Sequence, residues 1–76
     1  MPLYKEYGVL ASGLSLAERG RPGAYVPFAS VFTWNDGCFR LARQFTWDDL
    51  EQPSAEAAKV TADALVRRAI DCGDVV

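Results

Sequence analysis

Two apolar patterns divide this chain of 76 residues. Up to Trp47 the large apolar side chains are mostly aromatic or β-branched and recur at every second position, whereas from Ser54 to Cys72 apolar residues recur every three or four positions. Alternation is typical of strands, and a spacing of three to four is typical of an amphipathic helix. The sequence therefore predicts a single α+β domain, in which a three-stranded antiparallel sheet packs on one long C-terminal helix (β-β-β-α).

The aromatic part predicts three strands, at about residues 3–16, 24–34 and 38–47. Gly8 and Gly13 favour a bend or a bulge in the first strand. Asn35-Asp36-Gly37 predicts a tight hairpin between the second and third strands, because these residues tolerate the positive φ that such turns need. Pro27 cannot donate a ladder hydrogen bond, so we expect the second strand to be an edge or to be bulged there.

Alternation sorts the side chains of the second and third strands into two faces. We expect the helix to cover the face with most of the large side chains, Val26, Phe28, Phe32, Trp34, Phe39, Leu41, Phe45 and Trp47. The uncovered face would then carry Tyr25, Pro27, Ala29, Val31, Cys38 and Ala42. Arg43 interrupts the large apolar face, which predicts a bulge that turns it outward or a stem that packs on the sheet with its guanidinium at the edge.

The helix is expected at about residues 53–72. It would begin at Pro53, or after Ser54 as the capping residue, and Gly73 fits the position just past its end. Small residues on its apolar stripe predict a close approach of helix to sheet. That stripe consists of Ala58, Ala62, Leu65, Val66, Ala69, Ile70 and Cys72. The alternating charges on the rest of the helix read as a solvated face with mutual ion pairs.

Composition indicates a folded protein, since 50% of the residues are apolar and 24% are charged. The formal net charge is −2, which makes nucleic acid an unlikely partner. No apolar run is long enough to span a bilayer, and the N-terminus lacks the pattern of a secretory signal. We therefore expect a cytoplasmic protein with no membrane contact.

The residues that usually carry catalysis are missing or scattered. The chain has no His, which removes the usual general base and the commonest transition-metal ligand. Cys38 and Cys72 are far apart in sequence and belong to no metal-ligand pattern, so two reduced, partly buried thiols are expected. The glycine spacing matches no nucleotide-binding loop. These features predict a protein that is not an enzyme and that holds no metal and no cofactor.

A chain of this size lies near the lower limit for a self-sufficient core, and one helix can cover only one face of a sheet. The sequence thus predicts a homodimer that acts through protein contact. The candidate interaction surface comprises Arg19, Arg21, Tyr25, Val31, Arg40 and Arg43. An alternative is a sheet that binds nucleic acid through the four arginines. Scattered solubilising charge is the simpler interpretation of those arginines, and it is the one we favour.

Several short segments resemble known small proteins. Tyr7-Gly8, Pro22 to Pro27, Phe45-Thr46, Glu56-Ala57-Ala58 and Ile70-Asp71 follow the order seen in small uncharacterised bacterial β-β-β-α proteins, a group with no assigned activity. The chain also resembles the HicB-type antitoxin domain, which binds and blocks a small toxin nuclease. The matching pieces there are Gly23-Ala24-Tyr25-Val26, Gly37-Cys38, Glu56-Ala57-Ala58 and Ala64-Leu65. The Pro-Asp-Leu-Pro segment of that domain is absent, and the link from strand to helix is longer. The resemblance implies the β-β-β-α fold and, as a lesser hypothesis, a regulatory antitoxin-like role.

Overall fold

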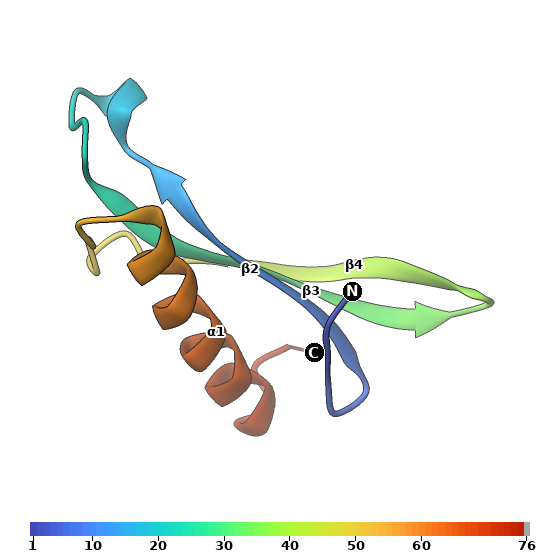
Figure 1. Cartoon of the computed structure of the whole chain (residues 1–76). Coiled ribbons are helices and arrows are strands. Elements are labelled where there is room, and N and C mark those ends of the chain that lie inside the picture. Colours follow the sequence, from blue (N-terminus) through green and yellow to red (C-terminus); the bar gives the residue numbers. More distant parts are fainter. Residues whose placement is uncertain (76) are drawn as a thin grey trace.

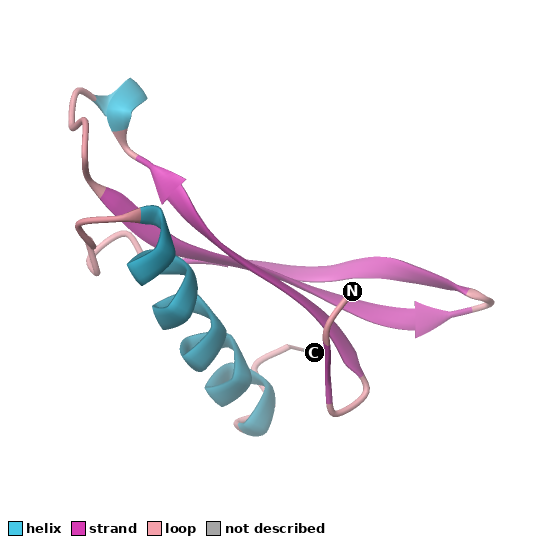
Figure 2. Ribbon diagram, in the orientation of Figure 1, coloured by secondary structure: helices cyan, strands magenta, loops and turns pink. Residues whose placement is uncertain are grey.

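In the computed structural model, which describes residues 1–75, an antiparallel sheet is covered on one face by a single helix (Figure 1). The elements are β1 (Leu3–Tyr4), β2 (Tyr7–Ser15), β3 (Tyr25–Asn35), β4 (Cys38–Thr46) and α1 (Ala55–Asp71), with a short 3-10 turn at Ala17–Arg19. The strands follow the chain order β1-β2-β3-β4 (Figure 2). The predicted α+β class, a sheet on one C-terminal helix, is confirmed.

The first predicted strand is in fact two strands. The chain turns back on itself between Tyr4 and Tyr7, which pair with each other, so that β1 is a two-residue strand at the sheet edge. Lys5 adopts a positive φ of 54° in this turn. Lysine rarely adopts this conformation, so the sequence gives no signal for a turn at Lys5. Alternation alone therefore predicts one strand where the structure has two.

The face that the helix covers is the opposite of the one expected. The core joins Ala62, Val66 and Ile70 of α1 and the C-terminal Val75 to the small residues Val9, Ala29 and Val31 of the sheet. The prediction that the large aromatic face lies under the helix is therefore wrong for β3. The physical reason is size, because the alanines on α1 fill the space only when small side chains oppose them.

A bulge lies beside Arg43, as expected, but it does not turn Arg43 away from α1. Val31 pairs with Arg43, but the next residue, Phe32, pairs with Leu41, which leaves Ala42 as the extra residue of β4. A bulge of this kind shifts the alternation by one position. Odd-numbered residues of β4 therefore face away from α1 before Ala42 and toward α1 after it.

This shift splits the five side chains that were expected to face the helix together. Arg43 and Phe45 remain on the side of α1, whereas Leu41 and Phe39 lie on the other side, opposite Phe32 and Trp34. The rings of Phe45 and Trp47 are stacked at 5.5 Å and pack against the core. The expected inner position is confirmed for Phe45 and Trp47 and is wrong for Phe39 and Leu41.

β3 is central in the sheet, but at Pro27 it is an edge on one side, as expected, because β4 has ended while β2 still pairs with β3 through Gly13. The carbonyl oxygen of Pro27 accepts a hydrogen bond from the backbone N–H of Trp47 at 3.1 Å. Its missing N–H points to the same side, where β4 has already ended at Thr46. A proline is tolerated in β3 because no ladder hydrogen bond is required at that point.

The helix begins after Ser54, whose Oγ accepts a hydrogen bond from the N–H of Ala57 at 3.1 Å. Gly73 follows its end with a φ of 77°, as a C-terminal glycine should. Of the expected stripe, Ala58, Ala62, Val66 and Ile70 are buried and Leu65 and Ala69 are half-buried, but Cys72 is exposed, so its expected place in the core is wrong. In residues 1–75, no helix is long and apolar enough to cross a membrane.

Candidate protein interface

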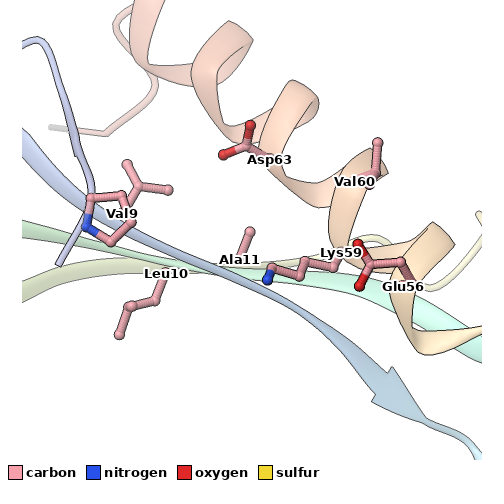
Figure 3. Close-up of a pocket in the computed structure, with 8 residues that line it drawn as sticks. Val9, Leu10, Ala11, Glu56, Lys59, Val60 and Asp63 are labelled. Carbon is pink, nitrogen blue, oxygen red and sulfur yellow. The ribbon is translucent and has the colours of Figure 1, made fainter.

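The sheet face that points away from α1, called here the distal face, is built from alternate residues of the strands. The cross-strand pairs Leu10 with Ser30 and Phe32 with Leu41 lie on it, and Figure 3 shows Leu10 on the opposite side of β2 from Ala11. Its large apolar side chains are Leu10, Leu14, Phe28, Phe32, Trp34, Phe39 and Leu41. Sequence analysis had placed most of these residues in the core.

The distal face is apolar, exposed and free of charge. Trp34 is 61% exposed and Leu41 is 54% exposed, and the rings of Trp34 and Phe39 meet edge to face at 5.0 Å. The only charged residues of β2, β3 and β4 are Arg40 and Arg43, and both lie on the side of α1. Monomeric proteins rarely expose a continuous apolar patch of this extent.

Two polar side chains of the distal face are paired with each other. Gln44 Nε2 donates a hydrogen bond to Ser30 Oγ at 3.3 Å, and Ser30 is buried between the neighbouring strands. Among the described residues that are not exposed, no buried side-chain nitrogen or oxygen atom lacks a hydrogen-bond partner. The exposed hydroxyl groups of Ser12 and Thr46 lie on the same face, so a covering surface must leave them hydrated or supply hydrogen-bond partners.

A second feature is the groove between the outer edge of β2 and one side of α1. Pro2, Val9, Leu10 and Ala11 line it from the strand side, and Glu56, Lys59, Val60 and Asp63 line it from the helix (Figure 3). The hollow measures about 350 Å³. Val60 is 62% exposed, so one apolar side chain stands among three charged ones on the helix flank beside this strand edge.

The six residues predicted to form an interaction surface do not lie together. The turn Ala17–Arg19 is at one end of the sheet, and the β3–β4 hairpin projects from the other (Figure 1). Val31 is fully buried under α1, so its expected place on an uncovered face is wrong. The helix covers the face with small side chains, and Val31 belongs to that face.

Three of the four candidate arginines already contact acceptors of the same chain. Arg19 forms an ion pair with Asp48 at 3.4 Å, and Arg21 forms one with Glu51 at 2.9 Å. These pairs are exposed, so each contributes little to stability. They do reduce the positive charge that the loop presents to a phosphate group.

Arg43 has a structural contact. Its guanidinium donates a hydrogen bond to the carbonyl oxygen of Asp74 and lies 4.8 Å from the centre of the Phe45 ring. The neighbouring Val75 is part of the core. Arg43 therefore holds the C-terminal segment against the sheet. Tyr25 is half-buried and exchanges backbone hydrogen bonds with Gln52, at 3.0 and 2.7 Å.

A polar cluster joins the β1–β2 turn to the end of α1. The Tyr4 hydroxyl donates to Asp71 at 3.0 Å, and Lys5 forms an ion pair with the same carboxylate. The hydrogen bonds from Lys5 and Tyr4 hold the pKa of Asp71 below its ordinary value. The same contact with Asp71 raises the pKa of Tyr4 and of Lys5.

The thiols and carboxylates form no reactive arrangement within residues 1–75. Cys38 and Cys72 are free and exposed, and no group of His, Cys, Asp or Glu side chains in the described residues could hold a metal ion. Two further hollows lie beside Trp47, where Arg68, Cys72 and Asp74 are among the lining residues, and beside Trp34, where Glu6 and Tyr7 are.

Comparison of the chain with protein-family models, with curated proteins and with solved structures finds no match. A function is therefore inferred from the two surfaces described above.

Proposed function

We propose that the protein is a non-enzymatic module that acts through protein–protein contact as a homodimer, in which two copies pack distal face against distal face. The observation that carries this proposal is the uncharged distal face with its exposed Trp34 and Leu41. Interface centres are depleted in charge and enriched in aromatic residues. The distal face has both properties.

The size of the distal face fits a stable dimer. A standard interface buries about 800 Å² on each partner. The two longer dimensions of the molecule are 41 and 22 Å, so the outline of its broad side can accommodate an interface of that size. Contact through this face would convert the sheet into one layer of a sandwich, with α1 on the outside of each copy.

A second copy suits this face better than a charged partner. A two-fold axis brings the same patch of both copies together, and a patch without charge meets its own copy without repulsion. The chain also needs the contact, because its core consists mainly of alanine and valine while most aromatic rings lie outside it. Covering the distal face would supply the burial of large side chains that the helix side lacks.

The alternative, a nucleic-acid-binding sheet, has weaker support. Three of the arginines contact oxygen atoms of their own chain, namely Arg19, Arg21 and Arg43. Arg40 lies on β4, whereas Arg19 and Arg21 lie in the loop between β2 and β3. Such a distribution gives no continuous basic stripe of the kind that follows a phosphate backbone. We therefore do not propose this function.

Sedimentation equilibrium at micromolar concentration tests the homodimer. We expect the wild-type chain to sediment at no less than twice its mass of 8.3 kDa. A Leu41→Lys variant should halve the observed mass, because it buries a charge at the centre of the contact. Ala64→Lys on the exposed side of α1 adds the same charge elsewhere and should leave the mass unchanged. A wild-type monomer, or an unchanged mass for Leu41→Lys, contradicts the proposal.

A further inference from the structure

We infer that the outer edge of β2 is a second contact between copies, in which β2 pairs antiparallel with β2 of another copy about a two-fold axis at Ser12. This contact goes beyond the proposed function, which concerns the distal face. It would join two sheets into one continuous sheet. Its occupant is a second copy of this chain.

The first step is the open edge. β1 pairs only with Tyr7 and Gly8 of β2, and the last hydrogen bond on this side runs from Val9 N–H to the Pro2 carbonyl at 2.9 Å. Backbone groups of alternate residues point to the same side of a strand. Ala11 and Gly13 therefore direct their N–H and C=O groups outward, where the described part of the chain supplies no strand.

The second step compares the two edges of the sheet. The β4 edge carries Arg40, Arg43 and the bulge at Ala42, and charges and bulges are devices that prevent strands from pairing at an edge. The exposed stretch of β2 contains no charge, no proline and no bulge. Of the two edges, β2 is the one built to accept another strand.

The third step is the self-complementary pattern of β2. With Ser12 opposite Ser12 of the second copy, Ala11 faces the second copy's Gly13, and their outward backbone groups form a hydrogen-bonded pair. Leu10 then faces Leu14 of the second copy on the distal side, where a leucine pair is favourable. Ala11 and Gly13 are small and leave room for α1 of both copies on the other side.

The fourth step is the helix flank above this edge. The backbone of Gly13 lies against Ala55 and Ala58, so the proposed axis passes at the level of the first turns of α1. The two helices would run antiparallel there, with Lys59 of each copy near Glu56 of the other. Val60, which lines the groove at the β2 edge, would be covered by the second copy. This reciprocal charge pattern favours a second copy over an unrelated strand.

Disulfide trapping tests the contact at a single residue. The two Ser12 residues would form a non-hydrogen-bonded pair, whose Cα atoms lie about 4.5 Å apart, within the range of about 4.4 to 6.8 Å that a disulfide spans. We expect a Ser12→Cys variant, with Cys38→Ser and Cys72→Ser, to form a covalent dimer under mild oxidation. Ser15→Cys in the same background is the matched control, since it would face Val9 and should remain monomeric on a non-reducing gel.

Further variants separate this inference from the proposed function. Adding Leu41→Lys should leave the Ser12→Cys cross-link intact, because that change affects only the distal face. Adding Val60→Lys should lower its yield, with circular dichroism confirming that the variant is folded. No cross-link at Ser12→Cys, equal cross-linking of Ser15→Cys, or loss of the Ser12→Cys cross-link when Leu41→Lys is added overturns the edge contact. The last outcome would assign the cross-link to the distal-face dimer, because Ser12 also lies on that face. If the wild type still sediments as a dimer in that case, the distal-face dimer stands alone.

Discussion

The backbone of Gly13 lies so close to the first residue of α1 that a Cβ atom on Gly13 would be 2.6 Å from the carbonyl oxygen of Ala55. The same atom would be 3.0 Å from the Cβ of Ala58. This contact fixes how near the helix can come to β2. It also explains why alanine and valine, rather than the aromatic residues, form the layer between helix and sheet.

Replacing Gly13 by alanine should therefore destabilise the protein by about 1 to 3 kcal/mol, the usual cost of inserting a methyl group into a filled space. The atoms in the way belong to the helix backbone and cannot move without shifting α1. Urea denaturation followed by circular dichroism measures the change. Ser12→Ala, on the exposed neighbouring position, should change the free energy of unfolding by less than about 0.5 kcal/mol. Equal stability of Gly13→Ala and wild type would show that the helix does not pack there.

The small-residue core makes a second prediction about α1. Ile70 is 7% exposed and is the largest side chain that the helix buries. Ile70→Ala should lower the free energy of unfolding by about 2 to 5 kcal/mol, since it leaves a cavity. Val60→Ala, on the exposed flank of the same helix, should have little effect when both variants are measured at a protein concentration at which the chain is monomeric. Similar losses for both variants would contradict the assigned helix face.

Local signals in the sequence predicted local structure well. Asn35-Asp36-Gly37 forms the expected turn, with positive φ at Asp36 and Gly37, and Ser54 caps the helix. These features depend on the backbone preferences of one or two residues. The turn at Lys5 was missed for the same reason, because lysine has no preference for the conformation that it adopts there.

The choice between the two faces of β3 could not be made from alternation. Val31 and Phe32 are both apolar neighbours, and a pattern with a period of two has the same form whichever set is buried. The deciding quantity is the volume available under the helix, which depends on the contact between Gly13 and Ala55. When the face with the small side chains is assigned to the core, the large apolar side chains form the distal face, and its lack of charge becomes evident. The free edge of β2 could not be predicted either, because the sequence predicts a single strand in place of β1 and β2.

Acid should weaken the link between the β1–β2 turn and the end of α1. The contacts from Lys5 and Tyr4 hold the pKa of Asp71 below its ordinary value, so these contacts stabilise the fold above the pKa that the carboxyl group has in the unfolded chain. This contribution is lost as the pH falls through the lower pKa of the folded state. We expect the free energy of unfolding to fall with pH below about pH 4, the ordinary range of an aspartate.

An Asp71→Asn variant isolates this effect. Its stability should be less dependent on pH in the acid range than that of the wild type, and thermal unfolding at a series of pH values measures the difference. Asp36→Asn in the hairpin turn, far from the cluster, should keep the wild-type dependence. Identical profiles for Asp71→Asn and wild type would contradict the link.

Arg43 and Arg40 provide a last contrast, because they lie three residues apart on β4 yet have different environments. The Arg43 guanidinium contacts the Asp74 carbonyl and the Phe45 ring, and it thereby holds the chain segment that places Val75 in the core. Arg43→Ala should lower the free energy of unfolding by about 1 kcal/mol through the loss of the hydrogen bond and the ring contact. Arg40→Ala, an exposed change on the same strand, should alter it by less than about 0.5 kcal/mol. Equal effects of the two changes would contradict the structural role of Arg43. Salt-dependent binding of nucleic acid that both changes weaken would instead support the nucleic-acid-binding sheet.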